Sequence, residues 1–305
     1  MKLNIHPDYQ ITMGISLEDS YELFRKFTLP EGMEYREIAI PGPEPGQSIQ
    51  AFLYKPATEV SPLPIIMDVH GGGFVGGEAY LDRTRDIALA CNVPALIVAI
   101  NYRLAPEHPF PAALMDCLAA WNWLYENGAS LGGDPERMGC YGTSAGGNLC
   151  AAMAFYIRDH GGPKIALNAL NVPGLSVGTS LSKDQMRYGA PALADSKGLN
   201  QQFFMQYLGP EQMGKPYSYY AVPNLAVDFI GLPPTLIITA EYDPIREDGM
   251  EYCRKLREAD VPVELYLMPR VGHGFDGMVP DAPMTKWIWK GIAMSFQREF
   301  RMPIG

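Results

Sequence analysis

Short stretches rich in apolar residues recur along the chain, and helix-length segments separate most of them. From the third stretch onward, apolar and polar residues do not alternate, which is typical of parallel strands buried on both faces by crossover helices. The pattern therefore predicts an α/β fold around a mostly parallel sheet. We expect eight strands, at Arg36–Ile40, Ile49–Tyr54, Pro64–Val69, Ala95–Ile100, Arg137–Tyr141, Ile165–Leu170, Thr235–Thr239 and Val263–Met268.

Helical periodicity and helix-boundary residues predict five helices among these strands. Pro111 suits a first helical turn, whereas Gly128 and the pair Gly161-Gly162 are stop signals. We expect the helices at Asp82–Ala90, Pro111–Glu126, Ala145–Asp159, Arg246–Ala259 and Met284–Phe300.

Two segments interrupt this order of strands and helices: residues 1 to about 35 and residues from about 176 to 222. In the first, Ser16-Leu17-Glu18-Asp19 resembles a capping box that opens an amphipathic helix. The second is rich in Met, Tyr and Phe. Long insertions in a compact α/β domain are usually lids or binding loops, and ordinary packing of these aromatic residues against the core is the alternative.

Composition and charge narrow the class of protein. Apolar residues make up 47% and charged residues 19% of the 305 residues, as in globular proteins. The formal net charge of -10, with no run of Lys and Arg to offset it, argues against nucleic acid as a partner. The first residues lack the apolar stretch of a signal peptide, and the apolar runs are strand-sized, so we expect a cytoplasmic protein with no stable membrane insertion.

The cysteines lack the spacing of a metal site. They are odd in number and scattered, with no Cys-x-x-Cys pair. Reduced, mostly buried thiols are therefore expected at Cys91, Cys117, Cys140, Cys150 and Cys253.

A first chemical motif is Gly142-Thr143-Ser144-Ala145-Gly146, which follows one predicted strand and precedes a predicted helix. This is the context of the Gly-x-Ser-x-Gly nucleophile elbow, in which the two glycines allow a tight turn that exposes the serine. The motif predicts Ser144 as a nucleophile, and a plain glycine-rich turn is the alternative.

A second motif is the glycine loop His70-Gly71-Gly72-Gly73-Phe74, directly after the third predicted strand. Acyl transfer places negative charge on the former carbonyl oxygen, and fixed backbone N–H groups stabilise that charge. Lipases and esterases combine such a loop with the N–H of the residue after the nucleophile, here Ala145. A phosphate-binding loop is disfavoured because the lysine of a P-loop is missing.

Chain order selects the general base and the acid. In folds with this elbow the acid and then the histidine follow the serine, so His273, in the turn after the last predicted strand, is the expected base. Asp243 follows the seventh predicted strand and is the expected acid. The nearby carboxylates Glu241, Glu247 and Asp248 are competitors, although acidic residues also suit the first turn of the next helix.

Together, His70–Phe74, Tyr102–Ala112, Gly142–Gly147, Asp243-Pro244 and His273–Phe275 resemble motifs of the hormone-sensitive lipase family, in its bacterial-type esterase branch. The match spans about residues 35 to 300, and the motifs occur in the family's order. Two departures are Thr143, where many relatives have Asp, and Glu247-Asp248, where relatives more often show Asp then Glu. The first leaves the mechanism unchanged, and the second affects only the cap-side neighbours of the acid.

The resemblance implies a single α/β-hydrolase domain over residues 1–305, with a helical cap made of about residues 1–35 and 176–222. It implies a serine carboxylesterase that hydrolyses short-chain acyl esters through an acyl-enzyme intermediate, without cofactor or metal. Relatives are often dimers, so a homodimer is left open. Carried over by position, the triad and the oxyanion-hole donors are Ser144, Asp243 and His273, and Gly72, Gly73 and Ala145.

Three alternatives remain at this point. An amidase or arylacetamide deacetylase-like hydrolase would use the same residues on another bond. A non-catalytic ligand-binding relative would resemble the plant gibberellin receptor, which lacks the catalytic histidine, whereas His273 is present here. A lipase acting at oil-water interfaces is disfavoured by the lack of an extended apolar surface or a secretion signal.

Overall fold

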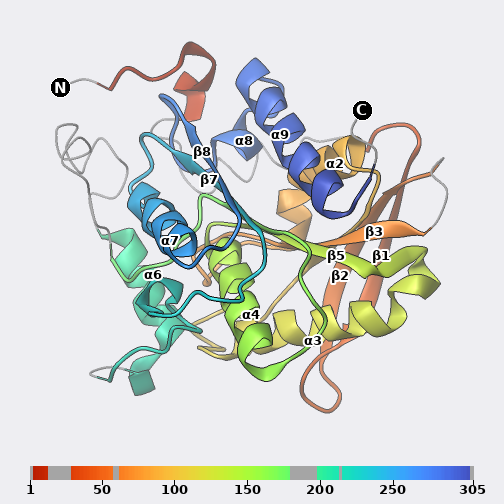
Figure 1. The fold of residues 1–305 in the computed structure, drawn as a ribbon, viewed down its shortest axis with the longest axis horizontal. Coiled ribbons are helices and arrows are strands. Elements are labelled where there is room, and N and C mark those ends of the chain that lie inside the picture. The colour runs from red at the N-terminus through yellow and green to blue at the C-terminus, as the bar shows by residue number, and fades with distance from the viewer. Residues whose placement is uncertain (1–2, 13–28, 58–61, 179–197, 213–214, 303–305) are drawn as a thin grey trace.

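A central sheet organises the molecule. The computed structural model describes residues 3–12, 29–57, 62–178, 198–212 and 215–302, and its eight strands lie in the order β1-β2-β4-β3-β5-β6-β7-β8 (Figure 1). The pairs β1–β2 and β2–β4 are antiparallel, and all other neighbours are parallel, which confirms the predicted sheet. The strands are β1 (Met33–Pro41), β2 (Ser48–Pro56), β3 (Leu63–Val69), β4 (Leu96–Ile100), β5 (Gly133–Thr143), β6 (Asn168–Asn171), β7 (Thr235–Ala240) and β8 (Val263–Met268).

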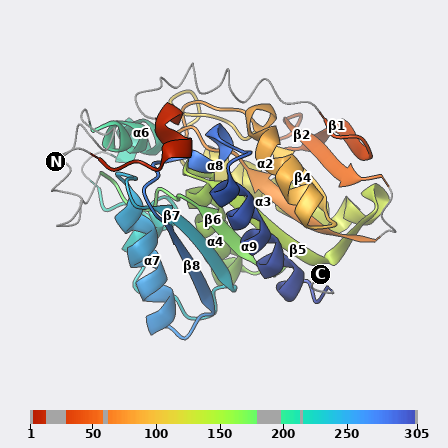
Figure 2. The ribbon, with the colours of Figure 1, turned by 90° about the horizontal axis from the view of Figure 1, so that it is seen from above.

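Helices cover both faces of the sheet. One buried cluster joins α3, α4 and α7 to one face, and a second joins α2 and α9 to the other (Figure 2). All five predicted helices are present, and α6 and α8 are additional. The helices are α2 (Ala79–Asn92), α3 (Ala112–Asn127), α4 (Ala145–His160), α6 (Leu199–Leu208), α7 (Arg246–Glu258), α8 (Phe275–Met278) and α9 (Pro283–Glu299). Short 3₁₀ turns are η1 (Pro7–Thr12), η2 (Gly128–Leu131), η4 (Pro210–Gln212) and η5 (Pro223–Leu225).

Burial explains why the apolar runs become central strands. Every residue of β3, β4 and β7 is buried, whereas the edge strand β1 exposes most of its residues and β8 is half-buried along most of its length. Each fully buried Val, Ile or Leu side chain stabilises the fold by about 1.5–3 kcal/mol. The unalternating strands therefore form the centre of the core, and apolar side chains of the helices pack on both of their faces.

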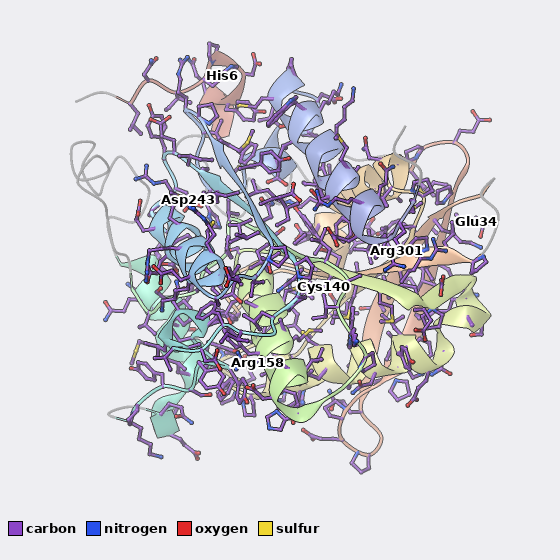
Figure 3. All side chains as sticks on the ribbon, viewed as in Figure 1. His6, Glu34, Cys140, Arg158, Asp243 and Arg301 are labelled. Atoms are coloured by element: carbon purple, nitrogen blue, oxygen red, sulfur yellow. The ribbon has the colours of Figure 1, made fainter. Side chains whose placement is uncertain are left out.

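The parallel strands bring distant loops to one edge. The loops after β3, β5, β7 and β8 all start at the carboxyl ends of parallel neighbours, where ligands bind in open α/β sheets. Figure 3 shows Asp243 beside α7 and Cys140 of β5 near the middle of the view. This edge therefore gathers the residues singled out by the sequence motifs.

The segments predicted to form a cap are described only in part. Residues 13–28, with the expected capping box at Ser16–Asp19, and residues 179–197 lie outside the described residues, so the cap stays a prediction. Within the described ranges, no helix combines the length and the apolar character needed to cross a bilayer.

Candidate active site

Ser144 occupies the turn between β5 and α4. Its backbone φ of 57° and ψ of −113° are unfavourable for a residue with a side chain, and its N–H donates to the Asn171 carbonyl at 2.9 Å. A Cβ on Gly142 would lie 2.4 Å from the Gly146 oxygen, and one on Gly146 would lie 1.8 Å from the Val69 oxygen. Both glycines of the elbow are therefore required by the close approach of β3, β5 and α4.

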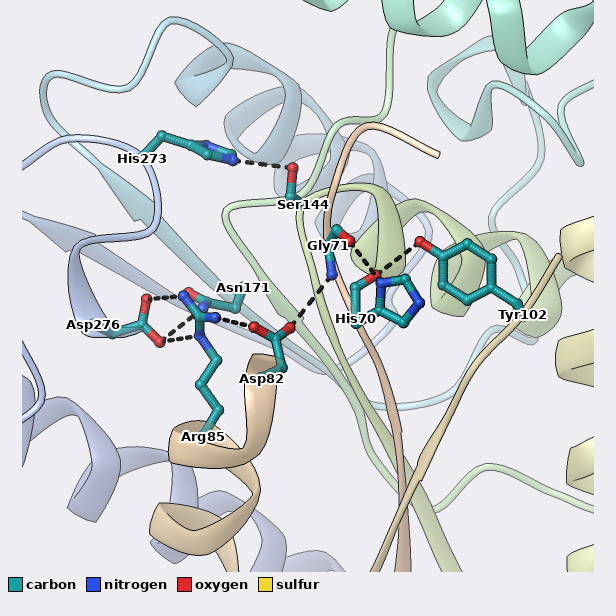
Figure 4. A network of polar contacts seen from close by, with 9 residues as sticks. All are labelled: His70, Gly71, Asp82, Arg85, Tyr102, Ser144, Asn171, His273 and Asp276. Carbon is teal, nitrogen blue, oxygen red and sulfur yellow. Dashed lines mark hydrogen bonds and ion pairs between the residues drawn. The ribbon is translucent and has the colours of Figure 1, made fainter. Parts of the chain in front are cut away.

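The three residues expected to form a triad lie in one hydrogen-bonded chain. His273 Nε2 is 3.0 Å from Ser144 Oγ, and His273 Nδ1 is 2.7 Å from Asp243 Oδ2 (Figure 4 shows the contact between His273 and Ser144). Asp243 is fully buried, and its second oxygen accepts the Ile245 N–H at 2.9 Å. The carboxylate is thereby held in place on the far side of the imidazole.

The charge of Asp243 acts on the imidazole. Burial opposes the charged form of His273, but the attraction and hydrogen bond of Asp243 outweigh it and raise the pKa of His273 above its usual value. A base that removes a serine proton becomes an imidazolium, and a buried carboxylate at this position stabilises that form. The electrostatics therefore favour proton transfer from Ser144 to His273.

The glycine loop runs beside the serine because β3 and β5 are neighbours. Val69 pairs with Gly142, so the residues that follow the two strands lie next to each other, and a Cβ on Gly71 would lie 3.4 Å from Ser144 Cβ. Gly72 and Gly73 have φ of 120° and 64°, which favour glycine.

The glycine loop and the elbow also supply backbone N–H groups beside Ser144. Among the described residues, no acceptor takes a hydrogen bond from the backbone N–H of Gly72, Gly73 or Ala145. Ala145 also begins α4, whose N-terminus carries partial positive charge. These groups can therefore donate to an anionic oxygen.

A family profile matches this architecture. Residues 66–277 match the family described as alpha/beta hydrolase fold, a span that contains the glycine loop, the elbow, Asp243 and His273. The chain belongs to this hydrolase family. Its predicted resemblance to the bacterial esterase branch of the hormone-sensitive lipase family is confirmed.

Relatives of this hydrolase include characterised proteins and solved structures. Esterase LipI of Mycobacterium tuberculosis is 34% identical over 280 residues, which cover 90% of this chain and 87% of LipI. Carboxylesterase NlhH of the same species is 38% identical over 230 residues, which cover 73% of this chain and 70% of NlhH. The structure called Bacterial Heroin Esterase superposes with a TM-score of 0.84 at 30% identity, covering 92% of this chain and 88% of that one.

The other candidate acids of the hydrolase have different partners. Asp248 accepts the N–H groups of Leu175 and Ser176 at 2.7 and 2.9 Å, and burial raises its pKa to about 7. Glu247 pairs with its neighbour Arg246, and Glu241 accepts the Arg270 N–H at 2.7 Å. Of the four acidic candidates, Asp243 is the one that reaches His273.

Two of the remaining histidines have local roles. His70 is buried, its Nδ1 lies 2.7 Å from the Gly71 oxygen, and its ring stacks on Tyr102 with centroids 4.2 Å apart. The Tyr102 hydroxyl donates to the His70 carbonyl at 3.0 Å, so both residues support the glycine loop. His160 stacks on Tyr156 at the end of α4 and is exposed.

Sequence reasoning did not identify two groups of residues beside the site. Phe203 of α6 lies against Gly73, because a Cβ on that glycine would be 2.6 Å from the Phe203 ring. A buried ionic network around Arg85 lies below the elbow (Figure 4). The aromatic content of the segment from 176 to 222 was the signal for Phe203, whereas nothing in the pattern distinguished Arg85 from a surface arginine.

Within the described residues, no group of three or more His, Cys, Asp and Glu side chains is placed to hold a metal ion.

Proposed function

We propose that this carboxylic ester hydrolase is a serine carboxylesterase that works through an acyl-enzyme on Ser144. The observation that carries the proposal is the chain of contacts from Ser144 Oγ to His273 and Asp243, at 3.0 and 2.7 Å, beside the free N–H groups of the glycine loop. Nucleophile, base, orienting acid and oxyanion donors are all needed for acyl transfer, and here they adjoin one another.

In the first half-reaction, Ser144 Oγ attacks the ester carbonyl carbon and its proton passes to His273 Nε2. The carbonyl oxygen becomes an oxyanion, which accepts hydrogen bonds from the N–H groups of Gly72, Gly73 and Ala145. When the tetrahedral intermediate collapses, the bond to the alkoxide breaks and the alkoxide takes the proton from His273. The acyl group then remains bonded to Ser144.

In the second half-reaction, a water molecule replaces the alcohol. His273 Nε2 removes a proton from the water as its oxygen attacks the acyl carbon, and the same N–H groups hold the new oxyanion. Collapse releases the carboxylic acid and returns the proton from His273 to Ser144 Oγ. Asp243 stays charged and orients the imidazole throughout.

We propose short-chain acyl esters as the substrates, and packing above the glycine loop supports this. The Phe203 ring lies against Gly73, and the adjacent Tyr207 stacks on Phe74 with ring centroids 3.9 Å apart. Phe204 and Tyr207 are buried, so α6 is anchored at this position. A fixed aromatic wall next to an oxyanion donor limits the length of the bound acyl group.

Substitution of Ser144 tests the mechanism. We expect Ser144→Ala to lower kcat for p-nitrophenyl butyrate by about 10⁴-fold or more, because only binding and the oxyanion hole remain. A fluorophosphonate should label Ser144, as located by mass spectrometry of the digested protein. Ser130→Ala, at an exposed serine in η2, is the matched control and should leave both results unchanged. Normal turnover by Ser144→Ala, or labelling of another serine, contradicts the proposal.

An acyl-length series tests the substrate class. For p-nitrophenyl esters from acetate to laurate, kcat/KM should be highest at butyrate or below, and Phe203→Ala should shift the optimum to longer chains. An optimum at laurate in the unmodified protein would instead indicate a lipase.

Matched ester and anilide substrates separate an esterase from an amidase, and we expect the ester to react faster.

A further inference from the structure

Three buried charges lie directly below the candidate active site. Arg85 of α2 and Asp276 of α8 are each 3% exposed, and Asp82 is 8% exposed. Arg85 Nε and Nη2 donate to the two oxygens of Asp276 at 2.8 and 3.2 Å, and Nη1 donates to Asp82. The planar guanidinium therefore joins two carboxylates from different helices, which a lysine ammonium does with less geometric control.

Asp82 connects this network to the glycine loop. Its second oxygen accepts the backbone N–H of Gly71 at 3.4 Å (Figure 4). Gly71 immediately precedes Gly72 and Gly73, whose N–H groups are proposed to hold the oxyanion. A displacement of Asp82 would therefore change the position of those donors.

Asp276 connects the network to the serine and to the histidine turn. It accepts Asn171 Nδ2 at 3.1 Å (Figure 4), and the Asn171 carbonyl accepts the Ser144 N–H at 2.9 Å. Asp276 follows His273 closely along the chain, and a Cβ on Gly274 would lie 3.8 Å from Arg85 Nη2. The guanidinium thus lies under the turn that carries the base.

Stability alone does not require this arrangement. Buried ion pairs can often be replaced by well-packed apolar residues without loss of stability, because the charges must first be removed from water. A catalytic group, in contrast, must stay within about 0.5 Å of its productive position, and that demands directional support from neighbouring groups. Here the supported groups come from separate segments that share Arg85.

We propose that Arg85 is a positioning residue for ester hydrolysis, fixing the glycine loop through Asp82 and the histidine turn through Asp276. This inference rests on the proposed function, because it concerns the alignment of Ser144, His273 and the oxyanion donors. In this proposal Arg85 acts through Asp82 and Asp276.

Kinetic comparison of Arg85 variants tests the inference. In Arg85→Met, kcat for p-nitrophenyl butyrate should fall about tenfold to a hundredfold while KM changes by less than about twofold, because misalignment by about 1 Å lowers the rate without removing substrate contacts. The rate of fluorophosphonate labelling of Ser144 should fall in parallel. Arg85→Lys, which keeps the charge, should restore part of both rates.

Arg137→Met is the matched control. Arg137 lies in β5 before the elbow, pairs with Asp134 at 2.6 Å and donates to the Pro62 carbonyl, so its loss removes a partly buried ion pair outside the site. Circular dichroism should show that each variant is folded, and all rates should be measured well below its Tm. We expect Arg137→Met to retain the kcat of the unmodified protein.

The outcomes separate the two proposals. Folded Arg85→Met with unchanged kcat and labelling rate overturns the role of Arg85. If Arg85→Met does not fold, Arg85→Lys and Asp276→Asn decide in its place: lowered kcat at constant KM supports the role, and unchanged kcat overturns it. If the unmodified protein is not labelled at Ser144, the proposed function fails first, whatever the variants do.

Discussion

His273 illustrates how a single residue sets the working pH. Asp243 raises the pKa of His273, and catalysis needs the neutral imidazole, so activity should be lost as the pH falls through that raised pKa. A raised folded-state pKa also stabilises the fold below the unfolded-state pKa of about 6.5. That contribution disappears as the pH rises through the folded-state pKa, the same range in which activity appears.

The pH dependence of kcat/KM tests this at the residue scale. Between pH 5 and 9, we expect the acid limb for p-nitrophenyl butyrate to have its midpoint above about 6.5, the usual pKa of histidine. Asp243→Asn should lower kcat by about 10⁴-fold, because the imidazole loses its orienting carboxylate. A midpoint below 6.5 would show that burial, and not Asp243, dominates at His273.

Some residues of the site could be named from the sequence and others could not. Ser144 and His273 each follow a predicted strand, and they occur in a fixed order along the chain. The sequence motifs around them were therefore sufficient to identify both residues. Asp243 had three acidic neighbours, and only its position against His273 distinguishes it from them. Arg85 gave no signal, because its two carboxylate partners become adjacent only through tertiary packing.

At the scale of elements, the elbow requires glycine because β3 and α4 pack too closely to leave room for a side chain. A Cβ on Gly146 would lie 1.8 Å from the Val69 oxygen, which belongs to the rigid backbone of β3. We expect Gly146→Ala to destabilise the protein by about 3 kcal/mol in urea denaturation, and to lower kcat because α4 moves away from the sheet.

Gly291→Ala is the matched control, since Gly291 lies in α9 and a Cβ there would lie 3.2 Å from the Tyr266 hydroxyl oxygen. The end of a side chain can move aside, and alanine favours a helix over glycine by about 1 kcal/mol. Equal destabilisation by the two substitutions would contradict the steric account of Gly146.

Element boundaries were predicted less well than element types. The run from Ile165 was expected to start a strand, but β6 begins at Asn168, where pairing with Cys140 starts. Ala166 and Leu167 already make backbone hydrogen bonds to Met138 and Cys140 of β5, but the regular strand ladder starts only at Asn168. Helix α6 was not predicted because its aromatic-rich sequence lacks a clear start signal, and α8 has only four residues.

At the scale of the whole molecule, strand directions were predictable but strand order was not. Unalternating runs indicate parallel strands, yet they do not say which strands are neighbours. In the structure β3 lies between β4 and β5. The strand that follows β3 in the chain lies on one side of it, and the next strand, β5, lies on the other side. This places the glycine loop beside the elbow at a switch point, the usual ligand position in open α/β sheets. The cap, a homodimer and a cytoplasmic location stay predictions.

The order Ser144, Asp243, His273 along the chain has a consequence during synthesis. A growing polypeptide that has left the ribosome as far as α4 carries the nucleophile, but its base still lies beyond β8, among the last residues to emerge. In the proposed mechanism, Ser144 therefore has no base while the nascent chain is incomplete. In the proposed mechanism, hydrolysis therefore begins only after the turn beyond β8 has joined the fold.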